Sequence, residues 1–303
     1  MKSCLHISKN ANRQVRDAIL ISGSSRSGTT ILGKLLHSFQ GVEYAFEPPM
    51  LFSVIALIEE IPKKQWKLLY ETYLYEDFFI NAISGRSINC NRVDDSSIYS
   101  VKSAEDIELR LTRSLSKIQA EELCQDHIIA YKMPDVVPFL PKLFEYYPTM
   151  RIIIMRRDAN ETLNSILVKK WFANESENKN LIWPYRIHRG IQIPFWVKKR
   201  DSDRWVEMSE LDRCAYYYIR VNQDVEALVN RIEVKYDQLL NTPFQVARKL
   251  ADKLGLSFSD KTSEIIETIK PTQKKRELGL IEKVSAELAD LVRYYSDSSE
   301  VGT

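Results

Sequence analysis

The feature that most constrains the fold is a buried strand that runs into a glycine- and serine-rich loop and then into a helix. Residues 18–21 read Ala-Ile-Leu-Ile, residues 22–30 read Ser-Gly-Ser-Ser-Arg-Ser-Gly-Thr-Thr, and an apolar-periodic segment begins at Ile31. Such a junction aims successive backbone N–H groups and a helix N-terminus at one point, which makes an anion-binding site. The sequence therefore predicts an α/β domain that holds an anion at the end of its first strand.

The glycines of this loop have the spacing of a phosphate loop, G-x-x-x-x-G, from Gly23 to Gly28. A nucleotide kinase or ATPase would carry lysine after the second glycine, whereas this chain has Thr29 there. Its cation lies inside the loop, as Arg26, where a fork-shaped guanidinium can clamp a short phosphate group directly. The loop is therefore predicted to hold a phosphate, but not a triphosphate.

Four more short apolar runs follow the first strand and alternate with helical patterns, at residues 42–46, 128–132, 151–156 and 232–236. This alternation is typical of a parallel sheet with crossover helices. The run at 151–156 is the most β-branched and predicts an interior strand, whereas the shorter, more polar run at 232–236 predicts an edge. We expect a three-layer α/β fold, with a central parallel sheet flanked by helices.

Two insertions elaborate this predicted fold, and we expect the whole chain, residues 1–303, to form one domain. The first insertion, at about 51–125, is mostly helical. The second, at about 171–208, contains four of the five tryptophans among many basic and polar residues. Its aromatic rings are expected either to stack on a sugar face or surround a cationic group, or to form a hydrophobic satellite core.

Composition excludes several classes of protein. The net charge of +2 is too small to argue for nucleic-acid binding, so any preference for anions must come from local cations. The four cysteines have neither metal-ligand nor disulfide-framework spacing, and we expect reduced, packed thiols and no metal site. Because no apolar run reaches membrane-spanning length, we expect a cytoplasmic protein.

A second candidate anion site lies at the end of the strand at 151–156. Arg157 falls at the carboxyl end of this strand, Asp158 is a candidate N-cap with Glu161 as its reciprocal capping partner, and Ser165 lies about two turns into the helix. In open α/β sheets, ligands bind beyond the carboxyl ends of the strands. The alternative is a capping box beside a surface arginine.

Together these motifs resemble sulfotransferases that use 3′-phosphoadenosine 5′-phosphosulfate (PAPS), closest to the carbohydrate and tyrosyl-protein type. The segment Gly-Ser-Ser-Arg-Ser-Gly-Thr-Thr resembles their 5′-phosphosulfate loop, and Arg157-x7-Ser165 resembles their 3′-phosphate motif, in the same order. The resemblance implies a P-loop fold, PAPS as co-substrate, no metal, and cofactor contacts from both motifs, namely Ser25, Arg26, Ser27, Gly28, Thr29, Thr30, Arg157 and Ser165.

Catalytic candidates lie at the ends of two predicted strands. Glu47, which follows the run at 42–46 and precedes two prolines, can accept the proton of an acceptor hydroxyl or amine. Its position resembles that of the catalytic glutamate in tyrosyl-protein sulfotransferases, and His188 is the rival base. Lys132 resembles the family's lysine before proline, and with Arg26 it would stabilise the departing bisphosphate.

The end of the chain resembles the family less. Residues 234–240 are similar to its V-x-Y-E-D-L element, which implies that Tyr236 touches the nucleotide. The family's glycine-flanked R-K-G-x-x-G signature is absent, and the basic segment from Lys270 to Arg276 is expected to be either a lid or an exposed helix start.

We expect in-line transfer of a sulfuryl group to a small polar metabolite or natural product. A saccharide or glycolipid acceptor is the alternative. A P-loop small-molecule kinase and a catalytically silent nucleotide-binding module are the interpretations from other classes.

Overall fold

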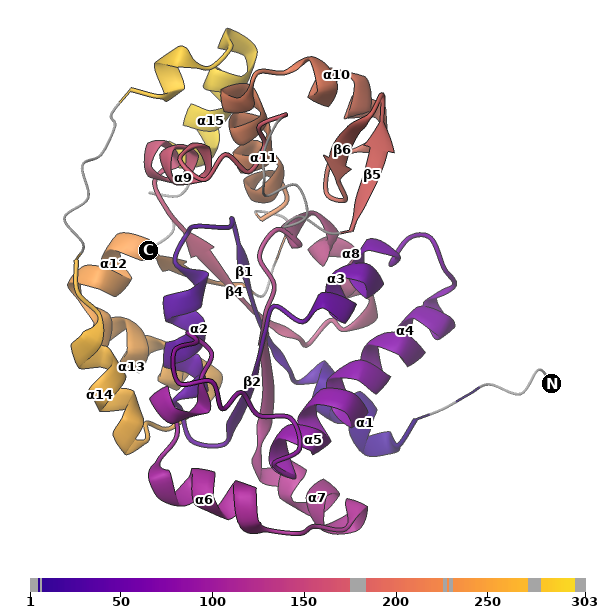
Figure 1. The fold of residues 1–303 in the computed structure, drawn as a ribbon, viewed down its shortest axis with the longest axis vertical. Helices are drawn as coiled ribbons and strands as arrows, with labels where there is room; N and C mark the ends of the chain where they lie inside the picture. The colour runs from indigo at the N-terminus through magenta and orange to yellow at the C-terminus, as the bar shows by residue number, and fades with distance from the viewer. Residues whose placement is uncertain are drawn as a thin grey trace.

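A five-stranded parallel sheet forms the centre of the computed structural model, which describes residues 5, 7–174, 184–225, 228, 231–271 and 279–297 (Figure 1). The strand order is β2-β3-β1-β4-β7, with every neighbouring pair parallel. The strands are β1 (Ile19–Gly23), β2 (Val42–Phe46), β3 (Ile128–Lys132), β4 (Arg151–Arg156) and β7 (Arg231–Lys235). The predicted α/β fold with a central parallel sheet is confirmed, with β4 in the interior and β7 at an edge.

The registers bring the carboxyl ends of these strands to one edge of the sheet. Gly23 pairs with Met155, and Phe46 pairs with Lys132. β7 ends one residue before the predicted boundary, because Tyr236 begins helix α12 (Tyr236–Asn241). The residues that follow β1, β2, β3 and β4 are thereby collected along this edge.

Both faces of the sheet are buried, which explains why its strands are nearly continuous apolar runs. Ile19, Ile21 and Ile153 belong to the core on one face, whereas Leu20 and Ile152 belong to the core on the other. The first face is covered by α2 (Thr29–His37), α12, α13 (Pro243–Leu254) and α14 (Asp260–Thr268). The second is covered mainly by α1 (Lys9–Arg16), α8 (Leu140–Tyr146) and the first insertion, and its core continues beyond the carboxyl edge into α9 (Ala159–Leu167) and α11 (Glu210–Gln223).

The first insertion is helical, as predicted. Its helices are α3 (Pro49–Ala56), α4 (Lys63–Glu71), α6 (Ala104–Thr112) and α7 (Lys117–Leu123), and α4 continues through a π-helix (Thr72–Phe79) into α5 (Ile80–Ile83). A buried ion pair fixes α6 to the sheet, because Arg110 Nη2 lies 2.7 Å from Glu43 Oε1 of β2.

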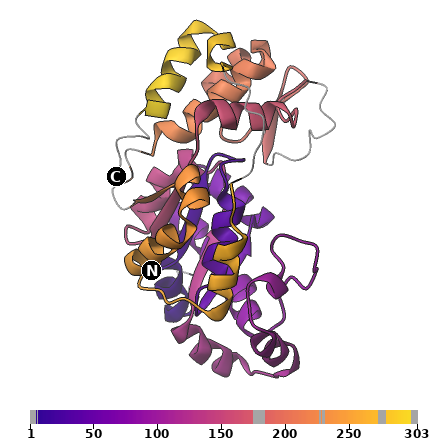
Figure 2. The same cartoon turned by 90° about the vertical axis from the view of Figure 1, so that its left-hand side faces the viewer.

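The second insertion contains a β-hairpin that the sequence analysis did not predict. Its strands are β5 (Tyr185–His188) and β6 (Ile191–Pro194), followed by α10 (Ser202–Glu207). Arg189 and Gly190 connect the strands with positive φ angles of 48° and 76°, as a type I′ turn requires. Together with α9, α11 and α15 (Ala286–Asp297), this hairpin lies above the carboxyl edge of the sheet (Figures 1 and 2).

Most described aromatic rings of this insertion pack into the hydrophobic core on the second face of the sheet, and not into a separate satellite core. Phe172, Trp196 and Trp205 are buried, and Trp196 packs against Tyr217 of α11 with ring centroids 4.9 Å apart. Trp183 lies outside the described residues.

Two further expectations concern the cysteines and membrane spans. Cys124 and Cys214 are buried free thiols, as expected, whereas Cys90 is a free thiol that is exposed and not packed, and Cys4 lies outside the described residues. In the part of the chain that the structure describes, no helix combines the length and the apolar character needed to cross a bilayer.

Replacing Gly33 of α2 with alanine should destabilise the fold by about 1–2 kcal/mol, although Gly→Ala inside a helix normally stabilises it. A Cβ atom at Gly33 would overlap the hydroxyl group of Tyr44, which is buried and has no hydrogen-bond partner among the described residues. Urea unfolding would measure the loss, and adding Tyr44→Phe should recover part of it. A more stable Gly33→Ala variant would show that the ring yields to the added methyl group.

Candidate active site

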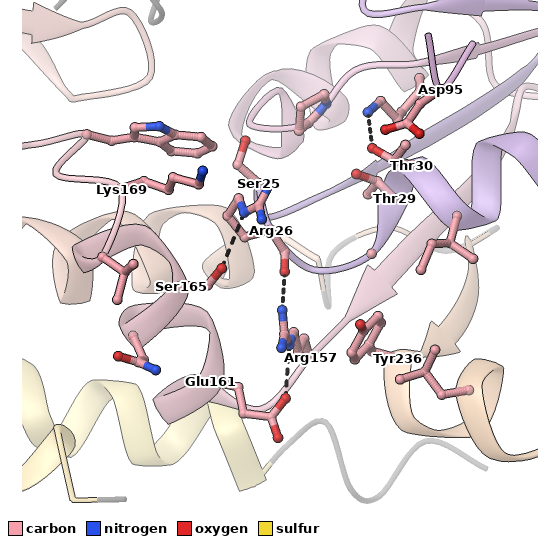
Figure 3. Close-up of a pocket in the computed structure, with 18 of the residues that line it drawn as sticks. Ser25, Arg26, Thr29, Thr30, Asp95, Arg157, Glu161, Ser165, Lys169 and Tyr236 are labelled. Carbon is pink, nitrogen blue, oxygen red and sulfur yellow. Dashed lines mark hydrogen bonds and ion pairs between the residues drawn. The ribbon is translucent and has the colours of Figure 1, made fainter. Parts of the chain in front are cut away.

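A cavity of about 810 Å³ lies at the carboxyl edge of the sheet (Figure 3). A volume in this range is typical of small-molecule and cofactor sites. The cavity brings together all the predicted site residues except Ser27: Ser25, Arg26, Gly28, Thr29, Thr30, Glu47, Lys132, Arg157, Ser165 and Tyr236.

Ser27 shapes the loop and does not line the cavity. Its side chain is fully buried, and both its backbone N–H and its hydroxyl donate to the Ser24 carbonyl, at 3.1 Å and 2.6 Å. These two bonds close a tight turn, after which the chain enters α2. At Gly28 the φ angle is +97°, and a Cβ atom would overlap the ring of Tyr236. Glycine is therefore required at this position both by the backbone conformation and by the approach of the ring.

The two predicted anion motifs contact each other directly. Arg26 Nε donates to Ser165 Oγ at 3.2 Å, and Arg157 Nη1 donates to the Arg26 carbonyl at 2.6 Å. Arg157 also lies over the ring of Tyr236, 4.4 Å from its centroid. Figure 3 shows Arg26 on the α9 side of the loop, between Ser165 and Ser25, and Thr30 on the other side. The guanidinium of Arg26 thus lies with the second motif and away from Lys132.

The expected capping box at α9 is only half present. Asp158 caps the helix by accepting from the Glu161 N–H at 2.9 Å, as predicted. The Glu161 side chain does not return this bond to the N-cap, because its carboxylate pairs with Arg157 Nε at 3.0 Å. The carboxylate is nearly buried and supplies a negative charge to a guanidinium that also faces the cavity. An anion that binds Arg157 therefore joins an existing ion pair.

Glu47 and Lys132 form a second ion pair at the opposite end of the cavity. Lys132 Nζ lies 2.6 Å from Glu47 Oε1, 2.9 Å from Thr30 Oγ1 and 3.9 Å from the centroid of the Phe46 ring. Burial lowers the pKa of Lys132, and the Glu47 carboxylate partly offsets this shift. Glu47 has a positive φ angle of 43°, and its N–H donates to the Lys132 carbonyl at 3.1 Å. The pair can accept a proton at one group and bind a developing negative charge at the other.

A family model described as the sulfotransferase family matches residues 18–260, which include both motifs and the two ion pairs. The chain belongs to the sulfotransferase family. Because the match covers the sheet from β1 to β7, the kinase interpretation has no support.

Solved sulfotransferase structures resemble this sulfotransferase at low sequence identity. The sulfotransferase domain of the Synechococcus PCC 7002 olefin synthase is 12% identical, with a TM-score of 0.48, over 94% of this chain and 95% of that one. A sulfotransferase from Alicyclobacillus acidocaldarius is 14% identical, with a TM-score of 0.42, over 94% and 96% of the two chains. No curated protein matches the sequence significantly.

Asp135 is a residue of this sulfotransferase site that the sequence analysis missed. It follows β3, and it accepts from the backbone N–H and the hydroxyl of Ser25 at 3.1 Å and 3.0 Å. Burial raises the pKa of Asp135 to about 6. The rule that singled out Glu47, an acidic residue just beyond a strand end, also applies to Asp135 in Lys-Met-Pro-Asp.

The rival base, His188, does not line the cavity. It lies on β5, and its Nε2 atom is 2.7 Å from Asp203 Oδ1 of α10. Of the basic segment at 270–276, Lys270 and Pro271 follow α14, and residues 272–276 lie outside the described residues.

Replacing His188 with asparagine should change kcat/KM for sulfuryl transfer by no more than about twofold, because surface ion pairs contribute little. Steady-state assays of sulfuryl transfer would measure this. A loss of more than about a hundredfold, the scale on which a general base acts, would restore His188 as the candidate.

Proposed function

We propose that this sulfotransferase is a single-domain enzyme that uses PAPS and transfers its sulfuryl group to a hydroxyl or amine. The observation that carries the proposal is that the phosphate loop and the Arg157/Ser165 corner line one cavity and contact each other through Arg26. Two anion sites joined in this way suit one nucleotide with two separate phosphates.

The residues present fit such a nucleotide. The N-terminus of α2, with the amides of Gly28, Thr29 and Thr30, would hold the 5′-phosphate. Arg157 and Ser165 would hold the 3′-phosphate, and the Tyr236 ring, already stacked under Arg157, would contact the nucleoside. Arg26 belongs to the phosphate loop and its Nε atom donates to Ser165, so its guanidinium would contact the nucleotide from the side of the 3′-phosphate corner.

Bound PAPS would supply an activated sulfuryl group, and the residues at the Glu47 end would manage protons and charge. Glu47 would take the acceptor proton as the acceptor atom bonds to sulfur and the bond from sulfur to the 5′-phosphate oxygen breaks in line. Lys132, held by Glu47 and Thr30, would stabilise the charge that develops on the departing bisphosphate, assisted by Arg26.

The proposed acceptor is a small polar metabolite or natural product, and a saccharide or glycolipid precursor is the alternative. It would enter beside Glu47, whose side chain is one-third exposed, and beside Phe46, which lines the same part of the cavity.

Calorimetric titration tests the nucleotide assignment. Adenosine 3′,5′-bisphosphate should bind more tightly than ATP, without added metal. Labelled PAPS with a panel of hydroxyl and amine acceptors would then identify the acceptor. Tighter binding of ATP, with a magnesium requirement, would overturn the proposal.

A further inference from the structure

Three donors converge on the carboxylate of Asp135, just behind the phosphate loop. Two come from Ser25, its backbone N–H at 3.1 Å and its hydroxyl at 3.0 Å, and the third is the phenol of Tyr217. The Ser25 N–H also reaches the Tyr217 oxygen. Asp135 itself is held at a positive φ angle of 70°, and its N–H donates to the Gly23 carbonyl at 3.0 Å. Hydrogen bonds from both its backbone and its side chain therefore hold Ser25 of the loop in place.

We propose that Asp135 is the positioning residue of the phosphate loop. This proposal rests on the proposed function of that loop as the 5′-phosphate site. Asp135 acts through Ser25, whose N–H and hydroxyl are both directed into the protein. Ser25 therefore contributes to nucleotide binding through the shape of the loop and not through a contact of its own. The amides presented to the phosphate are those at the start of α2.

The same carboxylate connects the loop to the second insertion. Tyr217 lies on α11, and its ring packs against Phe172 and Trp196, with centroid distances of 5.5 Å and 4.9 Å. Tyr217 thereby joins the phosphate loop, through Asp135, to side chains of the insertion that line no part of the loop.

The three donors favour a carboxylate at position 135, which can accept all three bonds at once. An ionised aspartate offers two acceptor oxygens, whereas asparagine offers one oxygen and a competing NH2 donor. Asp135→Asn should therefore weaken adenosine 3′,5′-bisphosphate binding about 10- to 100-fold, the range for a lost charge-assisted hydrogen bond. A purely electrostatic role predicts the opposite sign, because removing a negative charge near a phosphate site tightens anion binding.

The test compares calorimetric Kd values of the full-length protein and four variants. Ser25→Ala keeps the backbone N–H and should weaken binding less than Asp135→Asn. Asp95→Asn removes a carboxylate that lines the same cavity and has no hydrogen bond to the loop among the described residues, so it should leave the affinity for the bisphosphate unchanged or raise it. Should Asp135→Asn not fold, Tyr217→Phe replaces it, since it keeps the ring and removes the hydroxyl. For Asp135→Asn, or for Tyr217→Phe where it replaces that variant, a Kd within about twofold of the wild-type value or below it would overturn the proposal.

Hydrogen exchange separates this inference from the proposed function. In the nucleotide-free protein, the Ser25 amide should be protected in the wild type and should exchange at least about tenfold faster in Asp135→Asn. If the wild type binds no bisphosphate but this difference is found, the function fails and the positioning role stands. Equal exchange in both proteins would refute the positioning role, whatever the nucleotide affinity.

Discussion

Replacing Glu47 with glutamine should lower kcat for sulfuryl transfer by about 10²- to 10⁴-fold, the usual contribution of a positioned general base. Glutamine keeps the size of the side chain and an oxygen for Lys132 Nζ, which lies 2.6 Å from Glu47 Oε1, but it cannot accept the acceptor proton. It also removes the charge that partly offsets the effect of burial on the Lys132 pKa. Single-turnover kinetics with labelled PAPS would measure the chemical step.

Bisphosphate affinity provides the control for this variant, because Glu47 is assigned to the acceptor end of the cavity. The Kd of Glu47→Gln should stay within about threefold of the wild-type value, a change of less than 1 kcal/mol. Asp203→Asn, which changes a surface carboxylate outside the cavity, is the carboxylate control, and it should retain kcat. Turnover that survives in Glu47→Gln would mean that another group acts as the base.

Arg157→Ala should weaken adenosine 3′,5′-bisphosphate binding by at least about a hundredfold, or nearly 3 kcal/mol. The substitution removes the predicted 3′-phosphate donor and also leaves the Glu161 carboxylate without the partner now 3.0 Å away. That carboxylate would then repel the phosphate. The double variant with Glu161→Gln should therefore recover part of the loss.

The comparison with adenosine 5′-monophosphate locates the lost contact. If Arg157 holds the 3′-phosphate, the preference of the protein for the bisphosphate over the monophosphate should collapse in Arg157→Ala. An unchanged preference, with both nucleotides weakened equally, would place Arg157 outside the 3′-phosphate site and limit its role to supporting the Arg26 carbonyl.

The sheet and the two anion motifs could be predicted from the sequence because local patterns specify them. Short apolar runs bounded by proline or polar residues predicted β2, β3 and β4 with their observed ends. The β5–β6 hairpin was missed because Arg189 takes the positive φ angle that an Asn-Gly or Asp-Gly turn would signal. A hairpin turn is predicted from two residues, and here the first of them is Arg189 where asparagine or aspartate would be expected.

Contacts between distant segments could not be predicted in this way. Arg26 and Ser165 are 139 positions apart, and the sequence assigned them to opposite ends of a nucleotide, whereas the structure joins their side chains. Ser25 and Tyr217 are 192 positions apart, and nothing near Tyr217 in the sequence indicates a bond to the loop. The Glu161 side chain had two local partners available, the N-cap backbone and Arg157, and the buried charge pair prevailed.

A crystal structure with adenosine 3′,5′-bisphosphate tests the central claim most directly. The account predicts the 5′-phosphate on the amides of Gly28, Thr29 and Thr30, and the 3′-phosphate within hydrogen-bond distance of Arg157 and Ser165. A nucleotide bound elsewhere, or one that leaves Arg26 and Arg157 without a phosphate contact, would contradict it.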